Sequence, residues 1–429
     1  MQSELLRICT LIFSAFARIF MLIERQARPL IVEALDYSRV VLVLGARQVG
    51  KSTLTRQIAM SDRPAAVVTL DDLVTREAAR ADPHGFIAGL RGRVLIDEVQ
   101  RVPDLLYAIK EAVDEDPVPG RFLLTGSANI LTAPKISESL AGRVRRIELW
   151  PLAQSEIHRS TRNFVDCLFA GEPPQVSGAP VGREAFVEVV ARGGYPAVHT
   201  LDERQRRHWY RDYVQGIVER DLRDIASAQK LSEMPRLIRL LAAHSAKLLD
   251  YRGLASDLQI SDKTVSAYIG LLRTVFLVHI VPAWRPGLRS RELQAPKLYL
   301  TDTGLLAQQL GANQHRIAED DQLTGHALET FCGMEILKHQ SWAQEDYTLR
   351  HYRAHDDEID IVLESHSGDL VAIEVKARAS IREGDWRVMK RLRDMRAGRF
   401  KAGVVLYSGR QTIPLGERMW AVPISGLWS

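Results

Sequence analysis

Residues 40–60 read VVLVLGARQVGKSTLTRQIAM, and this stretch decides the fold of the first part of the chain. It places the pattern G-x-x-x-x-G-K-S between a continuous apolar run, typical of a strand buried on both faces, and the start of a helical pattern. Glycines let such a turn present successive N–H groups to phosphates, and the following helix adds its dipole. In such a site Lys51 reaches the β and γ phosphates, and the Ser52 hydroxyl binds Mg²⁺. The predicted cofactor-binding residues of this loop are Gly45, Ala46, Arg47, Gln48, Val49, Gly50, Lys51, Ser52 and Thr53.

A second apolar run, Val94–Ile96, ends in the acidic residues Asp97 and Glu98. Open α/β sheets bind their ligands at the carboxyl ends of the strands. We predict that Asp97 holds the Mg²⁺ shell through water and that Glu98 activates the attacking water, which makes ATP hydrolysis the expected reaction. Between Lys51 and Asp97 there is room for a helix, a strand at Ala66–Leu70 and a second helix. We therefore expect an additional strand between the lysine strand and the acidic strand, which favours a strand-inserted ATPase over a G protein or a nucleotide kinase.

A further predicted strand, Phe122–Thr125, leads into polar groups and then into a basic segment. Thr125 or Ser127 is placed to sense the γ-phosphate or to position water, although a simple strand cap explains the same residues. Arg143 is the candidate arginine finger that completes the active site of a neighbouring subunit. The alternative for Arg143 is a solvated basic turn.

The chain has 429 residues, with 57 Lys and Arg against 53 Asp and Glu, and a formal net charge of +4. This composition excludes a disordered, collagen-like or disulfide-stapled protein, and any nucleic-acid-binding surface must be local. Cys9, Cys167 and Cys332 fit no zinc spacing and are predicted to be free thiols in a reducing compartment.

The apolar stretch Leu5–Ile23 is interrupted by arginines, so its uncharged run is too short to span a bilayer. It is either an interfacial helix or an extension before a start at Met21. We predict a cytoplasmic protein.

The chain divides into an N-terminal extension (1–24) and three modules (25–155, 156–285 and 286–429). The first module alternates apolar runs with helical patterns, as a parallel α/β sheet does. The second is mostly helical after a Pro- and Gly-rich loop at 171–182. The third is mixed, with strands at Ile359–Glu364, Leu370–Val375 and Val404–Tyr407 and a basic helix from Asp385 to Arg396.

The motifs GARQVGKSTL, VTLDD, VLIDEVQRVPDLL, FLLTGSAN and SLAGRV resemble AAA+ ATPases of the bacterial and archaeal type that carry a long C-terminal extension. The similarity continues through YVQGIVERDLRDI, LASDLQISDKTVSAYIGLL, PKLYLTDTGL and IEVKA, and so covers the chain from Met21 onward. The resemblance implies an AAA+ core that forms a homo-oligomer. It implies no defined cellular role.

The segment Leu254–Leu272 is predicted to form a helix-turn-helix of the winged-helix type, with Ser261 capping the second helix. If that helix enters a major groove, Lys263, Thr264 and Ser266 meet DNA. The alternative is that this module packs against the ATPase core and contacts no bases. Upstream, four arginines surround aromatic residues in a pattern that suits either nucleic-acid stacking or an ordinary amphipathic helix: Arg204, Arg206, Arg207, Arg211, His208, Trp209 and Tyr210.

Asp360 precedes a strand, and Glu374 and Lys376 share one face of the next strand. This D…E-x-K order is similar to that of PD-(D/E)XK nucleases, in which two acids bind a metal ion and the lysine steers the attacking water. The resemblance implies a restriction-endonuclease-like fold, with Glu329 as a further metal ligand and Glu335 as the alternative. Solvated cross-strand charges explain the E-x-K pair equally well. The basic segment after it, including Lys390, Arg391 and Arg393, is either a phosphate-tracking surface or a solvated helix face.

The sequence thus predicts a Mg²⁺-dependent ATPase acting on DNA, with a candidate metal-dependent nuclease centre in its third module. A second hypothesis is a signalling or protein-remodelling ATPase whose nuclease-like domain is inactive and serves as a binding module. Both hypotheses require ATP and Mg²⁺, and neither requires a membrane.

Overall fold

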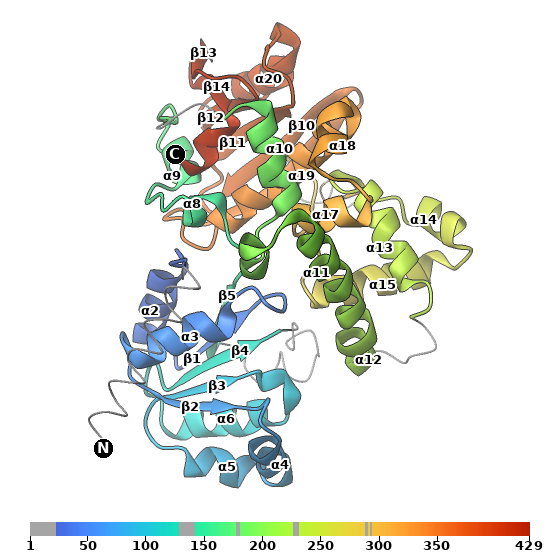
Figure 1. Cartoon of the computed structure of the whole chain (residues 1–429). Coiled ribbons are helices and arrows are strands. Elements are labelled where there is room, and N and C mark those ends of the chain that lie inside the picture. The colour runs from blue at the N-terminus through green and yellow to red at the C-terminus, as the bar shows by residue number, and fades with distance from the viewer. Residues whose placement is uncertain (1–22, 128–141, 177–180, 226–230, 288–290, 292–293) are drawn as a thin grey trace, which may run out of the picture.

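The computed structural model describes residues 23–127, 142–176, 181–225, 231–287, 291 and 294–429. The predicted N-terminal extension, 1–24, lies almost wholly outside these residues. Figure 1 shows an α/β unit built from the first third of the chain, a second α/β unit from the last third, and helices of the middle segment beside them. One continuous apolar core runs from Ala27 to Trp428 and joins all three parts, and a second core lies around Trp284 and Phe400.

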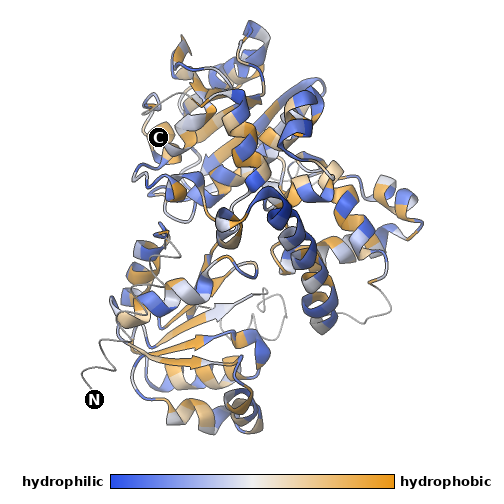
Figure 2. Ribbon diagram, in the orientation of Figure 1, coloured by the Kyte–Doolittle hydropathy of each residue, from blue (hydrophilic) through white to orange (hydrophobic). Residues whose placement is uncertain are grey.

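The first unit is a five-stranded parallel sheet in the order β2-β3-β4-β1-β5. Every residue of β1, β3 and β4 is buried, because helices cover both faces of the sheet. In Figure 2 the ribbon of β3 has hydrophobic colouring. The strands are β1 (Val40–Leu44), β2 (Ala66–Thr69), β3 (Val94–Asp97), β4 (Phe122–Gly126) and β5 (Val144–Glu148). The helices are α2 (Arg28–Tyr37), α3 (Lys51–Met60), α4 (Leu73–Ala81), α5 (Pro83–Gly89), η1 (Val99–Arg101) and α6 (Leu105–Glu115).

A strand does lie between the lysine strand β1 and the acidic strand β3, as the spacing predicts, but it is β4. The Ala66–Thr69 strand pairs with the outer side of β3 and forms the edge of the sheet. Its burial agrees with that position, since none of its four residues is fully buried. Two short helices, α4 and α5, replace the single helix expected between β2 and β3.

The middle segment is helical up to a small three-stranded sheet in the order β6-β8-β7. Its helices are α8 (Gln154–Ile157), α9 (Phe164–Phe169), α10 (Arg183–Arg192), η3 (Pro196–Thr200), α11 (Glu203–Gly216), the π-helical turn η4 (Ile217–Asp221), α12 (Leu222–Ile225) and α13 (Met234–Ala243). The sheet and its helices are β6 (Lys247–Leu248), α14 (Tyr251–Leu258), α15 (Asp262–Thr274), β7 (Val278–Val281) and β8 (Lys297–Leu300). The division predicted between residues 285 and 286 falls inside this sheet, because β7 and β8 pair with each other across it.

The predicted helix-turn-helix is present as α14 and α15, joined by a turn in which Gln259 has a φ of 57°. Ser261 caps α15 by accepting a hydrogen bond from the Thr264 N–H at 3.1 Å. Val265, Ile269 and Leu272 are buried, as predicted for the inner face of α15. With α13 and β6 before the two helices and β7 and β8 after them, the element order is the one expected for a winged helix.

The last unit is a mixed six-stranded sheet in the order β13-β14-β12-β11-β10-β9. Helix α19 packs on β11, and α20 packs on β10 and β12. The strands are β9 (Tyr347–Ala354), β10 (Asp357–Ser365), β11 (Leu370–Lys376), β12 (Phe400–Tyr407), β13 (Ile413–Gly416) and β14 (Met419–Pro423). The helices are α17 (Thr303–Gln309), α18 (Gln314–Glu319), α19 (Asp321–His339), η6 (Glu383–Asp385), α20 (Arg387–Met395) and η7 (Ile424–Trp428).

Two further sequence expectations concern the cysteines and the membrane. Cys167 and Cys332 are free thiols, whereas Cys9 lies outside the described residues. Within the described ranges, no helix is long and apolar enough to cross a membrane.

Candidate functional site

The loop between β1 and α3 has the backbone that phosphate binding requires. Gly50, with a φ of 96°, forms the N-cap of α3, and Gln48 also has a positive φ of 62°. A Cβ atom at Gly45 would lie 2.1 Å from the carbonyl oxygen of Leu149, so only glycine fits there. The loop therefore leaves its N–H groups and the amino end of α3 at the carboxyl edge of the sheet.

Lys51 lies folded over this loop. Its ammonium donates hydrogen bonds to the carbonyl oxygens of Gly45 and Ala46, at 2.9 and 2.8 Å. Burial lowers the pKa of Lys51 to about 8, although the carboxylates of Glu98 and Asp97 act in the opposite direction. Both hydrogen-bond acceptors of Lys51 are neutral carbonyl oxygens. A phosphate group entering the loop would give the ammonium an anionic partner.

Asp97 connects three of the predicted site residues. Its Oδ1 atom accepts hydrogen bonds from the Ser52 hydroxyl at 2.7 Å and from the Thr125 hydroxyl at 2.5 Å. Thr125 in turn accepts the N–H of Glu98 at 2.9 Å, and Glu98 has a left-handed φ of 60°. Ser127 accepts a hydrogen bond from the Gln100 side chain at 2.7 Å. The structure thus brings the phosphate loop, the acidic pair and the polar end of β4 together.

This oxygen set fits a magnesium–nucleotide complex. Mg²⁺ keeps several waters and phosphate oxygens and takes only one or two protein oxygens in sites of this kind. Ser52 and Asp97 supply those two oxygens 2.7 Å apart. Across the described residues, no group of three or more His, Cys, Asp or Glu side chains is arranged to hold a metal ion by itself.

Arg143 lies away from the site of its own chain. It precedes β5 at the amino edge of the sheet, whereas Lys51 follows β1 at the carboxyl edge. Its guanidinium pairs with Asp114, with an Nε–Oδ1 distance of 2.5 Å. Only a site on another subunit is compatible with the predicted role of Arg143.

The structure adds two contacts to the phosphate loop that no sequence motif signalled. Arg25 is buried and donates to the Val49 carbonyl at 2.6 Å, while its Nε atom pairs with Glu156 at 2.9 Å. Arg47, within the loop, pairs with Asp221 of η4 at 3.1 Å. The acidic partners, Glu156 and Asp221, lie more than a hundred residues away from these arginines in the chain, so local sequence patterns carry no signal for the two ion pairs.

The predicted nuclease residues also meet in space. The Asp360 carboxylate accepts the Val375 N–H at 2.9 Å, and the Glu374 carboxylate accepts the Asp360 N–H at 3.3 Å. The Lys376 ammonium lies 2.6 Å from Glu374. Burial raises the pKa of Glu374, and the nearby Asp360 raises it further.

Lys297, a residue that the sequence analysis did not single out, lies inside this acidic cluster. Its Nζ atom is 2.7 Å from Glu329, 2.9 Å from Glu358 and 3.5 Å from Asp360. Burial acts to lower the pKa of Lys297, but the surrounding negative charges, led by Glu329, raise it above its ordinary value. The donor set of Glu329 and Asp360 is therefore already paired with a cation, and it does not fit the predicted metal ion.

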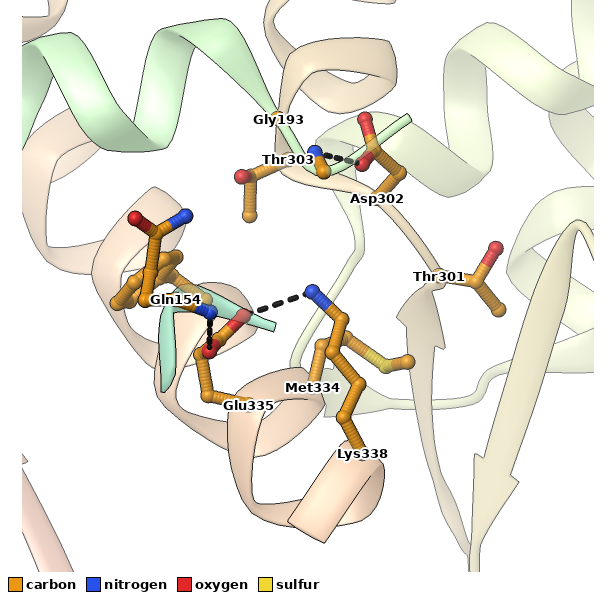
Figure 3. Close-up of a pocket in the computed structure, with 10 residues that line it drawn as sticks. Gln154, Gly193, Thr301, Asp302, Thr303, Met334, Glu335 and Lys338 are labelled. Carbon is orange, nitrogen blue, oxygen red and sulfur yellow. Dashed lines mark hydrogen bonds and ion pairs between the residues drawn. The ribbon is translucent and has the colours of Figure 1, made fainter. Parts of the chain in front are cut away.

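Glu335, the alternative to Glu329, lies at a different place. It is buried, pairs with Lys338 at 2.7 Å and accepts the Gln154 N–H at 2.7 Å (Figure 3). Lys338 also donates to the Leu152 carbonyl at 3.0 Å. These residues border a cavity of about 10 Å³, which is room for about one water molecule. Glu335 thus joins α19 to the segment that follows β5, through its contacts with Lys338 and the Gln154 N–H.

Some of the predicted DNA-contact residues are exposed, and others are already bonded to neighbouring side chains. Lys263 and Ser266 are exposed on α15, whereas the Thr264 hydroxyl is bonded to Ser261 within the helix cap. On α20, Lys390 is exposed, but Arg391 pairs with Asp357 at 2.6 Å and Arg393 pairs with Asp394 at 2.8 Å.

The aromatic residues of α11 are not a stacking platform. Trp209 stacks on Tyr213, with 5.1 Å between the ring centroids, and the buried Tyr210 hydroxyl donates to Asp302 at 2.8 Å. These rings belong to the core, so α11 is the amphipathic helix that the sequence left as an alternative. In Figure 2 the ribbon of α11 is mostly in hydrophilic colours.

Three domain families match successive parts of the chain. An AAA domain matches residues 37–158, and two domains of unknown function, DUF8612 and DUF4143, match residues 183–316 and 324–427. The chain therefore contains an AAA-type P-loop domain, which is consistent with ATP binding. A Thermotoga maritima RuvB structure covers 62% of the chain and 91% of its own length at 17% identity. Its TM-score of 0.25 is too low to establish a shared overall fold.

Relatives extend over nearly the whole chain. An uncharacterized Mycobacterium tuberculosis protein, Rv2008c, is 31% identical over 94% of this chain and 84% of its own length. An uncharacterized Methanocaldococcus jannaschii protein, MJ1544, is 19% identical over 78% of this chain and 73% of its own length. The chain belongs to the family of the mycobacterial protein Rv2008c, and in this chain an AAA domain precedes the C-terminal domain DUF4143.

Proposed function

We propose that this protein binds ATP at the loop 45–53 and hydrolyses it in a Mg²⁺-dependent reaction. One observation carries the proposal: Ser52, Asp97 and Thr125 are joined by hydrogen bonds beside the glycine loop and the Lys51 ammonium. A turn that only connected a strand to a helix would need neither the buried lysine nor the carboxylate aligned with the serine.

Each residue has a distinct part in this proposal. The loop N–H groups and Lys51 hold the phosphates, and Ser52 and Asp97 hold the magnesium shell. Bound Mg²⁺ would neutralise charge on the transferred phosphoryl group. Glu98 orients the attacking water, and Thr125 fixes Glu98 and Asp97 relative to each other through its two hydrogen bonds. Arg143 completes the site of an adjacent copy in a homo-oligomer.

We propose that DNA is the molecule on which this ATP-hydrolysing protein acts. Lys263 and Ser266 on α15 and Lys390 on α20 support this proposal because they are exposed on helices able to approach phosphates. The ion pairs of Arg391 and Arg393 weaken the basic surface of α20.

For the C-terminal domain, the pairing of Lys297 with Glu329, Glu358 and Asp360 favours a binding module over a metal-dependent nuclease. The same observation keeps the second hypothesis, a signalling or protein-remodelling ATPase, as the alternative. The two functions differ in whether DNA stimulates ATP turnover.

Steady-state phosphate release from the full chain, with and without DNA, tests the ATPase proposal. Lys51→Ala should abolish turnover, whereas Lys110→Ala, on α6 outside the site, should retain it. Turnover that survives Lys51→Ala would place ATP elsewhere.

A separate experiment tests for nucleic-acid cleavage. The wild-type protein and the Glu374→Ala variant are each incubated with single-stranded, duplex and branched DNA and RNA, and we expect no cleavage.

A further inference from the structure

The acidic cluster of the C-terminal domain draws its members from separate parts of the chain. Glu329 lies on α19, Glu358 and Asp360 lie on β10, and Glu374 lies on β11. Lys297 comes from β8, a strand of the small three-stranded sheet of the middle segment. The side chain of Lys297 is only 2% exposed, so its ammonium is shielded from solvent where it contacts these carboxylates.

Such a burial requires compensation, because an isolated ammonium in a protein interior is strongly unfavourable. Three carboxylates provide it, within 2.7 to 3.5 Å of the Nζ atom. The remaining acid of the cluster, Glu374, has its own ammonium partner in Lys376 at 2.6 Å. Each of the four carboxylates therefore already lies against a lysine.

The space between these carboxylates is where a divalent ion would have to lie. Mg²⁺ binds oxygens at about 2.0–2.1 Å, so it would compete with Nζ for the same oxygen atoms and be repelled by it at short range. The backbone N–H groups of Val375 and Asp360 occupy further lone pairs, on Asp360 and Glu374 respectively. A divalent ion bound by Glu329, Glu358 and Asp360 would therefore have to displace the Lys297 ammonium from the oxygens that it contacts.

We propose that Lys297 is the resident cation of this centre, and that its ammonium takes the place of the divalent metal ion that the sequence predicts here. The cluster then links β8 of the middle segment to α19 and β10 of the C-terminal unit without any metal. It follows that removing the ammonium converts the centre into a site for a divalent ion, made by Glu329, Glu358 and Asp360. This inference is independent of the ATPase proposal, since it involves no residue of the nucleotide site.

Mn²⁺ binding to the nucleotide-free full-length chain, measured by electron paramagnetic resonance, tests the proposal. Wild type and Asp360→Asn should bind the same amount of Mn²⁺. Lys297→Met should bind one additional Mn²⁺ per chain, and the double variant Lys297→Met/Asp360→Asn should lose it. Lys297→Arg, which keeps the charge, should gain none.

Lys338→Met is the matched control, because Lys338 is also buried and paired with a glutamate, Glu335, at another place on α19. It should gain no Mn²⁺. Mn²⁺ binding by wild type that Asp360→Asn removes would overturn the proposal, as would a folded Lys297→Met variant that gains no ion. If Lys297→Met fails to fold, the comparison of wild type with Asp360→Asn decides alone.

Discussion

Arg25 and Glu156 form a buried ion pair, with 2.9 Å between Nε and Oε1, across the base of the phosphate loop. The same guanidinium donates to the carbonyl oxygens of Val49 and Trp150. Glu156 in turn accepts the N–H groups of Gln26 and Ala153 at 2.9 Å. Arg25, which precedes β1, thus holds the phosphate loop against the segment that follows β5.

Replacing Arg25 should therefore destabilise the N-terminal α/β unit. Arg25→Ala leaves Glu156 buried without its cation, and such losses cost about 3–5 kcal/mol. The matched control is Arg28→Ala, which breaks a more exposed pair with Asp62 and should cost about 1 kcal/mol or less. Urea unfolding of both variants measures the difference. Equal free energies of unfolding would mean that the Arg25 pair contributes no more than a surface pair.

ATP affinity should fall as the pH rises above about 8. The pKa of Lys51 is lowered to about 8 by burial, so in the free protein its ammonium deprotonates above that pH. Phosphates favour the charged form, so binding must take up a proton there, and the affinity should drop by up to about tenfold per pH unit. Titration with a fluorescent ATP analogue between pH 7.5 and 9.5 measures this slope. Lys51→Met should bind weakly with no such slope, and a pH-independent wild type would contradict the prediction.

Thr125 should act on hydrolysis more than on binding. Thr125→Val removes the hydroxyl that bonds Asp97 at 2.5 Å and accepts the Glu98 N–H. A hydrogen bond to a charged group is worth about 1.5–3 kcal/mol, so kcat should fall by about tenfold or more while nucleotide affinity changes little. Thr125→Ser keeps the hydroxyl and should retain most of the activity. An unchanged kcat in a stably folded Thr125→Val variant would exclude this role.

DNA binding should depend on salt through Lys263 and Lys390. Each phosphate contact contributes about 0.9 to the slope of log K against log salt concentration, so Lys263→Ala or Lys390→Ala should each lower the slope by about that amount. Arg80→Ala, on an exposed face of α4, removes the same charge elsewhere and should leave the slope unchanged. Fluorescence anisotropy over a salt series gives the slopes, and a flat wild-type response would remove the support for DNA as substrate.

The sequence determined the local parts of this protein. The run from Val40 to Lys51 dictates strand, loop and helix, because apolar periodicity and the conformations of Gly45 and Gly50 act within a few residues. Ser261 likewise marks the start of α15 through a hydrogen bond to the N–H three residues later. The pairing of Asp360 with Glu374 follows from a short turn between adjacent strands.

Only the tertiary structure decided the contacts between distant segments. Which strand separates β1 from β3 depends on how the whole sheet is ordered, and the strand is β4, not the Ala66–Thr69 strand that lies between them along the chain. The pairing of Arg25 with Glu156 joins residues 131 positions apart. Lys297 lies in the segment PKLYLTDTGL, but no local pattern assigned it a partner, and it decides the chemistry of a cluster in which the sequence had identified Glu329 and Asp360. The reason is physical: side-chain patterns encode the local backbone, but the charge that a buried carboxylate meets is set by which element packs against it.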